Sequence, residues 1–168
     1  MRKEIINHAI YFLAYFIFLV VANSLYSLSY WPLLLGGIVG MMICYADHLL
    51  HIFVFNPQEL TSQRVIQLFK TKQYRAAMIL LYDTIDERKN LVFHTILFQI
   101  IFAVLTFWVV SSSGNLFARG LVLSYSLSLV LYNLKKFLKN EIIFEDKDKT
   151  RIYFAFQVLA LFIFGFLL

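Results

Sequence analysis

The sequence predicts an all-α fold, a polytopic membrane helix bundle, and three observations support this prediction. Hydrophobic residues make up 61% of the chain and charged residues only 15%, whereas a soluble domain is about 25% charged. The apolar residues come in blocks of about 20, the length that crosses a hydrocarbon core of about 30 Å. Almost all basic residues lie on one side of these blocks. Residues 1–168 are therefore expected to form a single integral membrane domain.

About five transmembrane helices are expected, one from each apolar block. They cover about 9–26, 32–55, 91–110, 116–134 and 152–168. Tyr26, Trp31 and Trp108 fall at span ends, where aromatic side chains favour the membrane interface. The first block is long and aromatic, and no small-residue cleavage site follows it, so its removal as a signal peptide is not expected. The single cysteine, Cys44, excludes an internal disulfide.

The basic residues predict how the spans are oriented. Fourteen of the 15 lysines and arginines precede span one or lie between spans two and three or spans four and five, and only Arg119 falls on the other side. The positive-inside rule then places the N-terminus in the cytoplasm and the C-terminus outside. The net charge of +5 fits loops that face anionic headgroups. Membrane lipid is therefore an expected partner, and nucleic acid is not.

Residues 57–90, between spans two and three, are predicted to form a cytoplasmic amphipathic helical hairpin. The sequence "NPQE" at Asn56–Glu59 suggests a helix start, with Asn as N-cap, Pro at N1 and Glu at N3. This helix should reach about Phe69. A second should run from about Lys72 to Arg88, with its apolar residues on one face. The hairpin would lie on the membrane surface or cap the bundle, where it could also meet a protein partner.

Span two carries small and polar residues along one helical stripe. In order, they are Gly36, Gly40, Cys44, Asp47, His48 and His51. The glycines predict close approach of a neighbouring helix, so the polar residues on the same stripe should face the bundle interior. At 1.5 Å per residue, Asp47 lies about 12 Å and His51 about 6 Å from the cytoplasmic end of the span, and His94 lies about 5 Å into span three. These residues are expected at similar depth.

The Asp and His residues allow three chemical interpretations. They could bind zinc or a similar divalent ion, relay protons, or form hydrogen bonds that hold helices together. His8 lies at the cytoplasmic entrance of span one, and Glu87 precedes His94 by two helical turns, so both could join the group. A b-type haem between His51 and His94 is a further alternative. Gln99 and Gln157, each alone in an apolar span, predict helix–helix hydrogen bonds.

Four segments resemble the motifs of the bacterial inner-membrane metal-dependent hydrolases of the YdjM type. They are "NHAIYFL" (Asn7–Leu13), "CYADH" (Cys44–His48), "FHTILFQIIFAVLTF" (Phe93–Phe107) and "GLVLSYSLSLVLYN" (Gly120–Asn133). The resemblance covers roughly the first four spans. The chain departs from the family pattern where Tyr45 replaces an Asp of the second motif, Lys89 stands near the first His of the third, and Ser128 and Tyr132 replace a His and an Asp of the fourth.

The resemblance implies a metal-dependent hydrolase of the bacterial inner (plasma) membrane. A divalent ion, zinc before others, would be held by Asp47, His48 and His94, with His8 as a further surviving motif residue. Glu87 or His51 would act as the base. The substrate would be a lipid or lipid-linked ester or phosphoester, because the site opens at headgroup depth.

Two other functions are open. One is a non-catalytic membrane scaffold, or a protein that binds a partner or lipid, in which the polar cluster only fixes helix packing. The other is a small transporter or proton-coupled channel. The outer halves of the spans offer few polar residues for a transport path, which disfavours the transporter.

Overall fold

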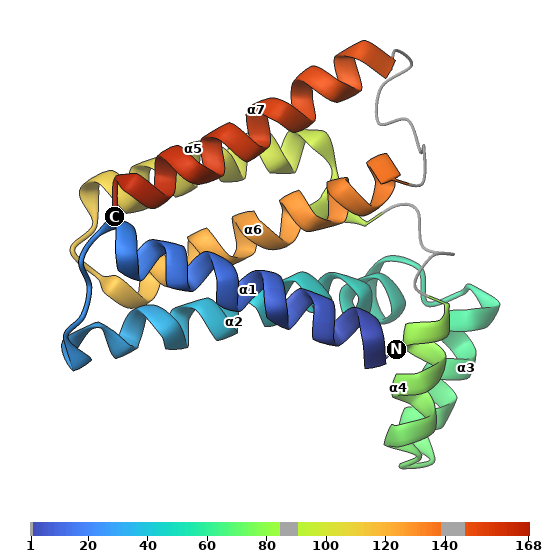
Figure 1. The fold of residues 1–168 in the computed structure, drawn as a ribbon. Helices are drawn as coiled ribbons and strands as arrows, with labels where there is room; N and C mark the ends of the chain where they lie inside the picture. The colour runs from blue at the N-terminus through green and yellow to red at the C-terminus, as the bar shows by residue number, and fades with distance from the viewer. Residues whose placement is uncertain (1, 85–90, 139–146) are drawn as a thin grey trace.

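The structure is a computed structural model of the chain that describes residues 2–84, 91–138 and 147–168. Within these ranges the regular elements are all helical and no β-strand occurs, which confirms the all-α class. The longer described helices pack in a bundle (Figure 1): α1 (Arg2–Ala22), α2 (Trp31–Leu50), α5 (Ile96–Ser112), α6 (Leu116–Leu138) and α7 (Lys147–Phe166). Two short helices, α3 (Leu60–Lys70) and α4 (Tyr74–Asp83), lie beyond one end of it.

Three of the described helices are long and apolar enough to cross a membrane. They are Trp31–Phe55, in which the π-helical turn η2 (His51–Phe55) extends α2, then Leu116–Leu138 and Asp148–Phe166. Two shorter apolar segments, Asn7–Ala22 and Ile96–Ser112, lie beside them in the bundle. Large apolar side chains are exposed along α1, α5 and α7. Such a surface fits hydrocarbon rather than water, as the composition predicted.

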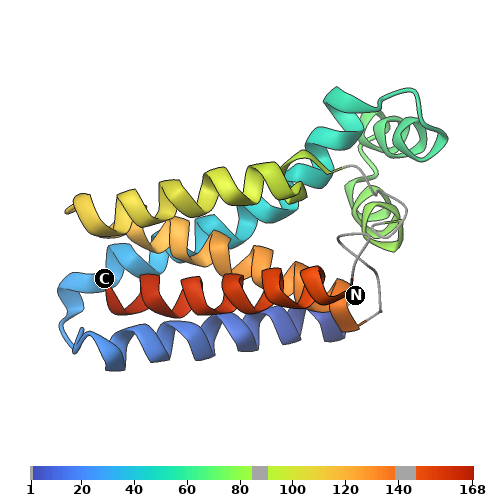
Figure 2. The ribbon, with the colours of Figure 1, turned by 90° about the horizontal axis from the view of Figure 1, so that it is seen from above.

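Consecutive bundle helices run in opposite directions (Figures 1 and 2). At one end, the Asn23 side chain donates to the backbone oxygen of Gly165 over 2.8 Å. The Arg119 guanidinium donates to the oxygen of Leu168 over 2.6 Å at the same end. The ends of α1 and α7 and the start of α6 are therefore joined there, while α3 and α4 lie at the opposite end.

Glycines allow the backbones of α2 and α6 to touch. A Cβ atom added at Gly36 would lie 2.8 Å from the carbonyl carbon of Phe117. A Cβ atom added at Gly40 would lie 3.1 Å from the carbonyl carbon of Leu121. From the other side, a Cβ at Gly120 would lie 2.8 Å from the carbonyl carbon of Leu33. All three distances are shorter than ordinary van der Waals contact. The close approach predicted from the small residues of span two is therefore confirmed.

Helix α6 is central and contacts α1, α2, α5 and α7. The hydrophobic core lies around it and includes Leu33 from α2, Leu123 and Leu127 from α6, and Leu161 from α7. Helix α1 contributes Tyr15, Phe16 and Leu19, and the Tyr15 hydroxyl donates to the Leu161 oxygen over 3.1 Å. This hydrogen bond satisfies a phenol in an otherwise apolar interface.

Two predicted helix starts are wrong. Helix α5 begins at Ile96 rather than at Leu91. Residues Val92–His94 form a 3-10 turn, η4, before it. Thr95 has an extended backbone and caps α5, because its hydroxyl accepts from the Phe98 N–H over 3.4 Å. Helix α3 begins at Leu60 rather than at the predicted Pro57, and Glu59 takes the N-cap position. The Asn56 side chain is not a helix cap there, because its amide contacts the ring of His51.

Candidate functional site

The centre of the candidate site is a contact between Asp47 and the turn that precedes α5. Asp47 is fully buried, and its Oδ2 lies 2.9 Å from Nδ1 of His94. The same oxygen accepts the backbone N–H of Phe93 over 2.9 Å. One carboxylate oxygen therefore binds both the side chain and the backbone of η4. Asp47 therefore ties α2 to the turn that precedes α5.

The two ring nitrogens of His94 contact different groups. A carboxylate accepts hydrogen bonds, so a proton on Nδ1 of His94 satisfies the contact with Asp47, and Nε2 faces the opposite side. The Sγ atom of Cys44, one helical turn before Asp47, lies 3.4 Å from this Nε2. The ring also packs on Tyr132, with the ring centroids 4.1 Å apart. Cys44, His94 and Asp47 thus form a thiol–imidazole–carboxylate series.

The other predicted site residues are placed differently. The buried ring of His48 lies 6.1 Å from that of His94, centroid to centroid. Nε2 of His51 lies 3.4 Å from a Glu59 oxygen and 3.3 Å from the Asn56 amide, so His51 faces the start of α3 and not Asp47. His8 is half-buried near the start of α1, and its part in the site stays a prediction. Glu87 lies outside the described residues.

A metal site would need more ligands than the structure brings together. Structural and catalytic zinc sites use at least three protein ligands. In the part of the chain that the structure describes, no three His, Cys, Asp or Glu side chains are close enough to hold an ion. Asp47 and His94 meet, but they hydrogen-bond to each other. Glu87 lies outside the described residues, so the metal ligands and the base stay predictions.

A second polar group joins α5, α6 and α7. Gln99 Oε1 accepts from the Asn133 amide over 2.9 Å, from the Tyr153 hydroxyl over 2.7 Å and from the Gln157 amide over 2.6 Å. Asn133 also donates to Gln157 Oε1 over 2.7 Å, and Gln157 donates to the Tyr153 hydroxyl over 3.0 Å. The predicted helix–helix bonding of Gln99 and Gln157 is confirmed.

Gln99 also connects this group to the Asp47 contact. Its Nε2 donates to the backbone oxygen of His94 over 2.9 Å, and both residues are buried. A continuous polar network therefore runs from α2 through η4 and α5 to α6 and α7. We call it the polar network; it consists of Cys44, Asp47, His94, Gln99, Asn133, Tyr153 and Gln157.

Sequence reasoning missed two members of the polar network. Tyr153 follows the basic loop, where it could equally well have been an interfacial aromatic residue. Cys44 was placed on the polar stripe of span two, but no contact with a histidine was predicted for it. Its spacing of three residues before Asp47 was the available signal, because it places the thiol and the carboxylate on one helical face.

Comparison of the chain with protein-family models, curated proteins and solved structures gives no match. The resemblance to the metal-dependent hydrolases therefore stays a prediction.

Proposed function

We propose that this is a five-span membrane protein with a non-catalytic role, a scaffold whose buried polar network holds its helices together. The observation that carries the proposal is the continuity of the polar network. Asp47, Gln99 and Asn133 bond to protein groups on neighbouring helices, and such bonds stabilise helix association in hydrocarbon.

The alternating directions of the bundle helices support five spans. Helix α5 has 17 residues, about 26 Å at 1.5 Å per residue, which approaches the thickness of the hydrocarbon core. Helix α1 has 21 residues in total. The end of α6 and the start of α7, which carry described basic residues such as Lys135 and Arg151, lie toward the end of the bundle where α3 and α4 are found. The positive-inside rule then supports a cytoplasmic N-terminus and an external C-terminus, which fits a bacterial inner membrane.

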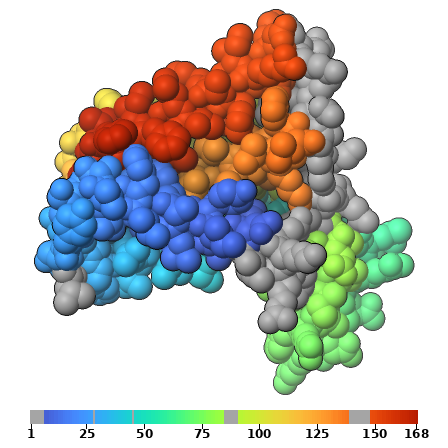
Figure 3. Space-filling model, viewed as in Figure 1, coloured from blue at the N-terminus to red at the C-terminus, as the bar shows by residue number. Residues whose placement is uncertain are grey.

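The surface that the scaffold would present is the α3–α4 pair, which stands away from the bundle in Figure 3. Its apolar residues Leu60, Tyr74 and Met78 are exposed, and basic residues such as Arg64 and Arg75 lie on the same two helices. Apolar side chains combined with positive charge suit a surface that lies among anionic headgroups. A protein partner at the same surface is the alternative occupant.

A comparison of two substitutions at Asp47 tests the structural role. In Asp47→Asn the side-chain oxygen can still accept from Phe93 and His94, whereas Asp47→Ala leaves both donors unsatisfied. We expect Asp47→Ala to lower stability in detergent by about 2–4 kcal/mol and Asp47→Asn by clearly less. Asp83→Asn, at an exposed position, is the control. An Asp47→Asn variant that is as stable as wild type but no longer performs the protein's role in cells would show that the negative charge of Asp47 serves chemistry. That result would contradict the scaffold.

A second function, hydrolysis of a lipid ester, is favoured by the Cys44–His94–Asp47 series. A nucleophile within hydrogen-bond reach of a base that is oriented by a third group is the geometry of covalent acyl transfer. His94 Nε2 would take the thiol proton while Sγ bonds to the ester carbonyl carbon. The imidazolium, stabilised by Asp47, would return the proton to the departing alcohol. Water would then cleave the thioester and release the fatty acid.

The single cysteine makes this second function easy to test. Incubation with a short-chain p-nitrophenyl ester should release p-nitrophenol and add one acyl mass to the intact protein, removable by hydroxylamine. Cys44→Ala should abolish both signals. Wild type that gives neither signal, although folded and monodisperse, would eliminate the thiol route and leave the scaffold.

A further inference from the structure

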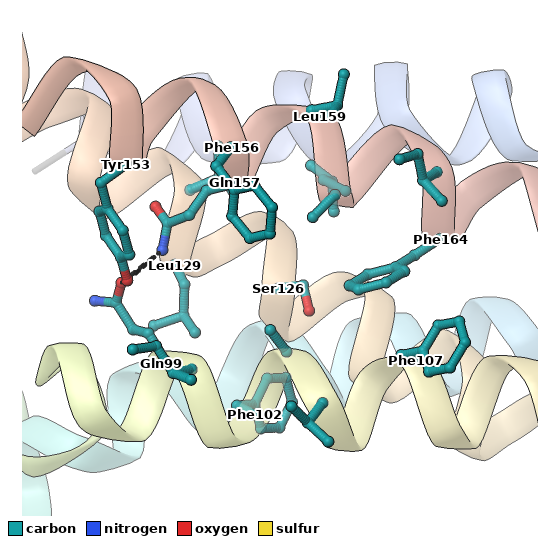
Figure 4. A pocket seen from close by; sticks show the side chains of 17 residues that line it. Gln99, Phe102, Phe107, Ser126, Leu129, Tyr153, Phe156, Gln157, Leu159 and Phe164 are labelled. Atoms are coloured by element: carbon teal, nitrogen blue, oxygen red, sulfur yellow. Dashed lines mark hydrogen bonds between the residues drawn. The ribbon is translucent and has the colours of Figure 1, made fainter. Parts of the chain in front are cut away.

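A cavity of about 440 Å³ lies between α5, α6 and α7 (Figure 4). Gln99, Tyr153 and Gln157 line one end, and Phe107 and Phe164 line the other. Small side chains leave the space between them open: Ala103 from α5, Ser126 from α6 and Ala160 from α7 all line it. Its volume is in the range of pockets that bind small molecules.

The cavity runs parallel to the bundle axis. Along α5, eight residues separate Gln99 from Phe107, about 12 Å at 1.5 Å per residue. Along α7, eleven residues separate Tyr153 from Phe164, about 16 Å by the same rise. In a membrane this direction is that of the lipid acyl chains. The polar end is the one near the start of α7 and therefore near the cytoplasmic headgroups.

The lining defines the chemistry of the occupant. Among the described residues, no charged side chain lines the cavity, and its walls are almost entirely hydrocarbon. The polar end consists of the uncharged amides of Gln99 and Gln157 and the phenol of Tyr153. An apolar chain with a neutral acceptor at one end satisfies both parts. A phosphate or another ion would be poorly matched.

The surroundings of the cavity indicate where this occupant comes from. Ile100, Val104, Phe156 and Leu159 line the cavity and are also exposed on the outer faces of α5 and α7, so the cavity adjoins the surface that faces hydrocarbon in a membrane. A partner helix, about 10–12 Å wide with its side chains, does not fit between α5 and α7, which already touch. We propose that the cavity binds one acyl chain of a membrane glycerolipid, with its ester group at Gln99. This goes beyond the proposed scaffold, which needs no ligand.

The test uses wild-type protein in vesicles of phosphatidylethanolamine and phosphatidylglycerol that contain a phosphatidylcholine probe with a diazirine on one acyl chain. After illumination, adducts are mapped by mass spectrometry. Lipids around the bundle reach exposed residues outside the cavity such as Leu97 and Leu105. Only a chain inside the cavity reaches Ser126 and Leu129 of α6, which lie behind α5 and α7 in Figure 4. We expect adducts on both of these α6 residues.

Filling the cavity should remove those adducts selectively. Ala160→Leu places three further carbons inside the cavity, whereas Ala155→Leu adds the same group at an exposed position of the same helix. We expect labelling of Ser126 and Leu129 to fall at least about fivefold in Ala160→Leu and to be unchanged in Ala155→Leu, with labelling of Leu97 equal in all three proteins.

Competition in wild type tests the polar end and needs no variant. An unlabelled ester-linked lipid should displace the probe roughly five to ten times better than its ether-linked analogue, which offers a poorer acceptor to the amide. Wild-type adducts confined to exposed residues, or equal labelling of α6 in both alanine variants, would overturn the acyl-chain site. Equal competition by the two lipids would overturn the assignment of the ester group to Gln99. None of these results depends on whether the polar network acts as a scaffold.

Discussion

The substitution Gly36→Ala should open the contact between α2 and α6. A methyl group at Gly36 would lie 2.8 Å from the carbonyl carbon of Phe117 and 3.0 Å from the backbone nitrogen of Leu121, and nearer still to the Phe117 oxygen. Ordinary contact begins near 3.4 Å, so the two helices must separate locally by more than 0.6 Å. Both neighbours are backbone atoms, which cannot rotate away as a side chain could.

The magnitude follows from two opposing effects. Overpacking in a close-packed interior costs about 1–3 kcal/mol, while alanine in place of glycine within a helix contributes up to about 1 kcal/mol of stabilisation. We expect a net loss of about 1–2 kcal/mol. For a chain of this size, soluble proteins shift their melting temperature by about 2–4 °C per kcal/mol, so Gly36→Ala should melt roughly 2–8 °C below wild type.

Thermal unfolding of the purified protein in a mild detergent, followed by size-exclusion chromatography of heated samples, would measure this shift. Gly114→Ala is the matched control, because a Cβ at Gly114 meets no atom within 4 Å. Gly120→Ala, on the opposite side of the same contact, should cost less in combination with Gly36→Ala than alone, since the helices have already separated. Gly36→Ala with the stability of wild type, beside an unaffected Gly114→Ala, would refute the close backbone contact.

Three further predictions concern the polar network, the metal and the topology. Gln99→Leu should lower the free energy of unfolding by about 1–3 kcal/mol in the same melting assay, because it leaves the donors of Asn133, Tyr153 and Gln157 in apolar surroundings. Gln67→Leu, at an exposed position, is the control. Equal stability of the two variants would contradict the network. Elemental analysis of purified protein should find well under one divalent ion per chain; about one zinc, lost in Asp47→Ala, would restore the metal-dependent hydrolase. The topology can be tested with a membrane-impermeant maleimide in a Cys44→Ser background. The reagent should label Ser112→Cys from outside intact cells but Thr71→Cys only after lysis. The reverse pattern would invert the proposed orientation.

The sequence predicted the bundle helices well where their signal was local. The apolar blocks around α2, α6 and α7 appear as helices long enough to cross a membrane, because hydrophobicity over a window depends only on the residues within it. The stripe of Gly36 and Gly40 likewise predicted close helix packing, since helical periodicity fixes which residues share a face.

The start of α5 could not be predicted in the same way. Residues 91–93 are apolar like the helix that follows, and a window average over the whole block does not separate residues 91–95 from it. The turn before α5 contacts Asp47, which is 46 residues earlier and accepts from the backbone N–H of Phe93. A donor taken by a distant carboxylate leaves no trace in the local sequence. Thr95 was a weak local signal, as a residue type favoured at helix caps.

What the sequence by itself determined is therefore the helical class, the apolar segments, the asymmetry of charge and the set of polar residues at similar depth. Only the tertiary structure decided that His94 rather than His48 or His51 meets Asp47, that Cys44 meets His94, and that Gln99 joins the two polar groups. The physical reason is that depth follows from counting residues along one helix. Contact between helices also depends on how each is rotated and how closely it packs, and here the glycines shared by α2 and α6 set that packing.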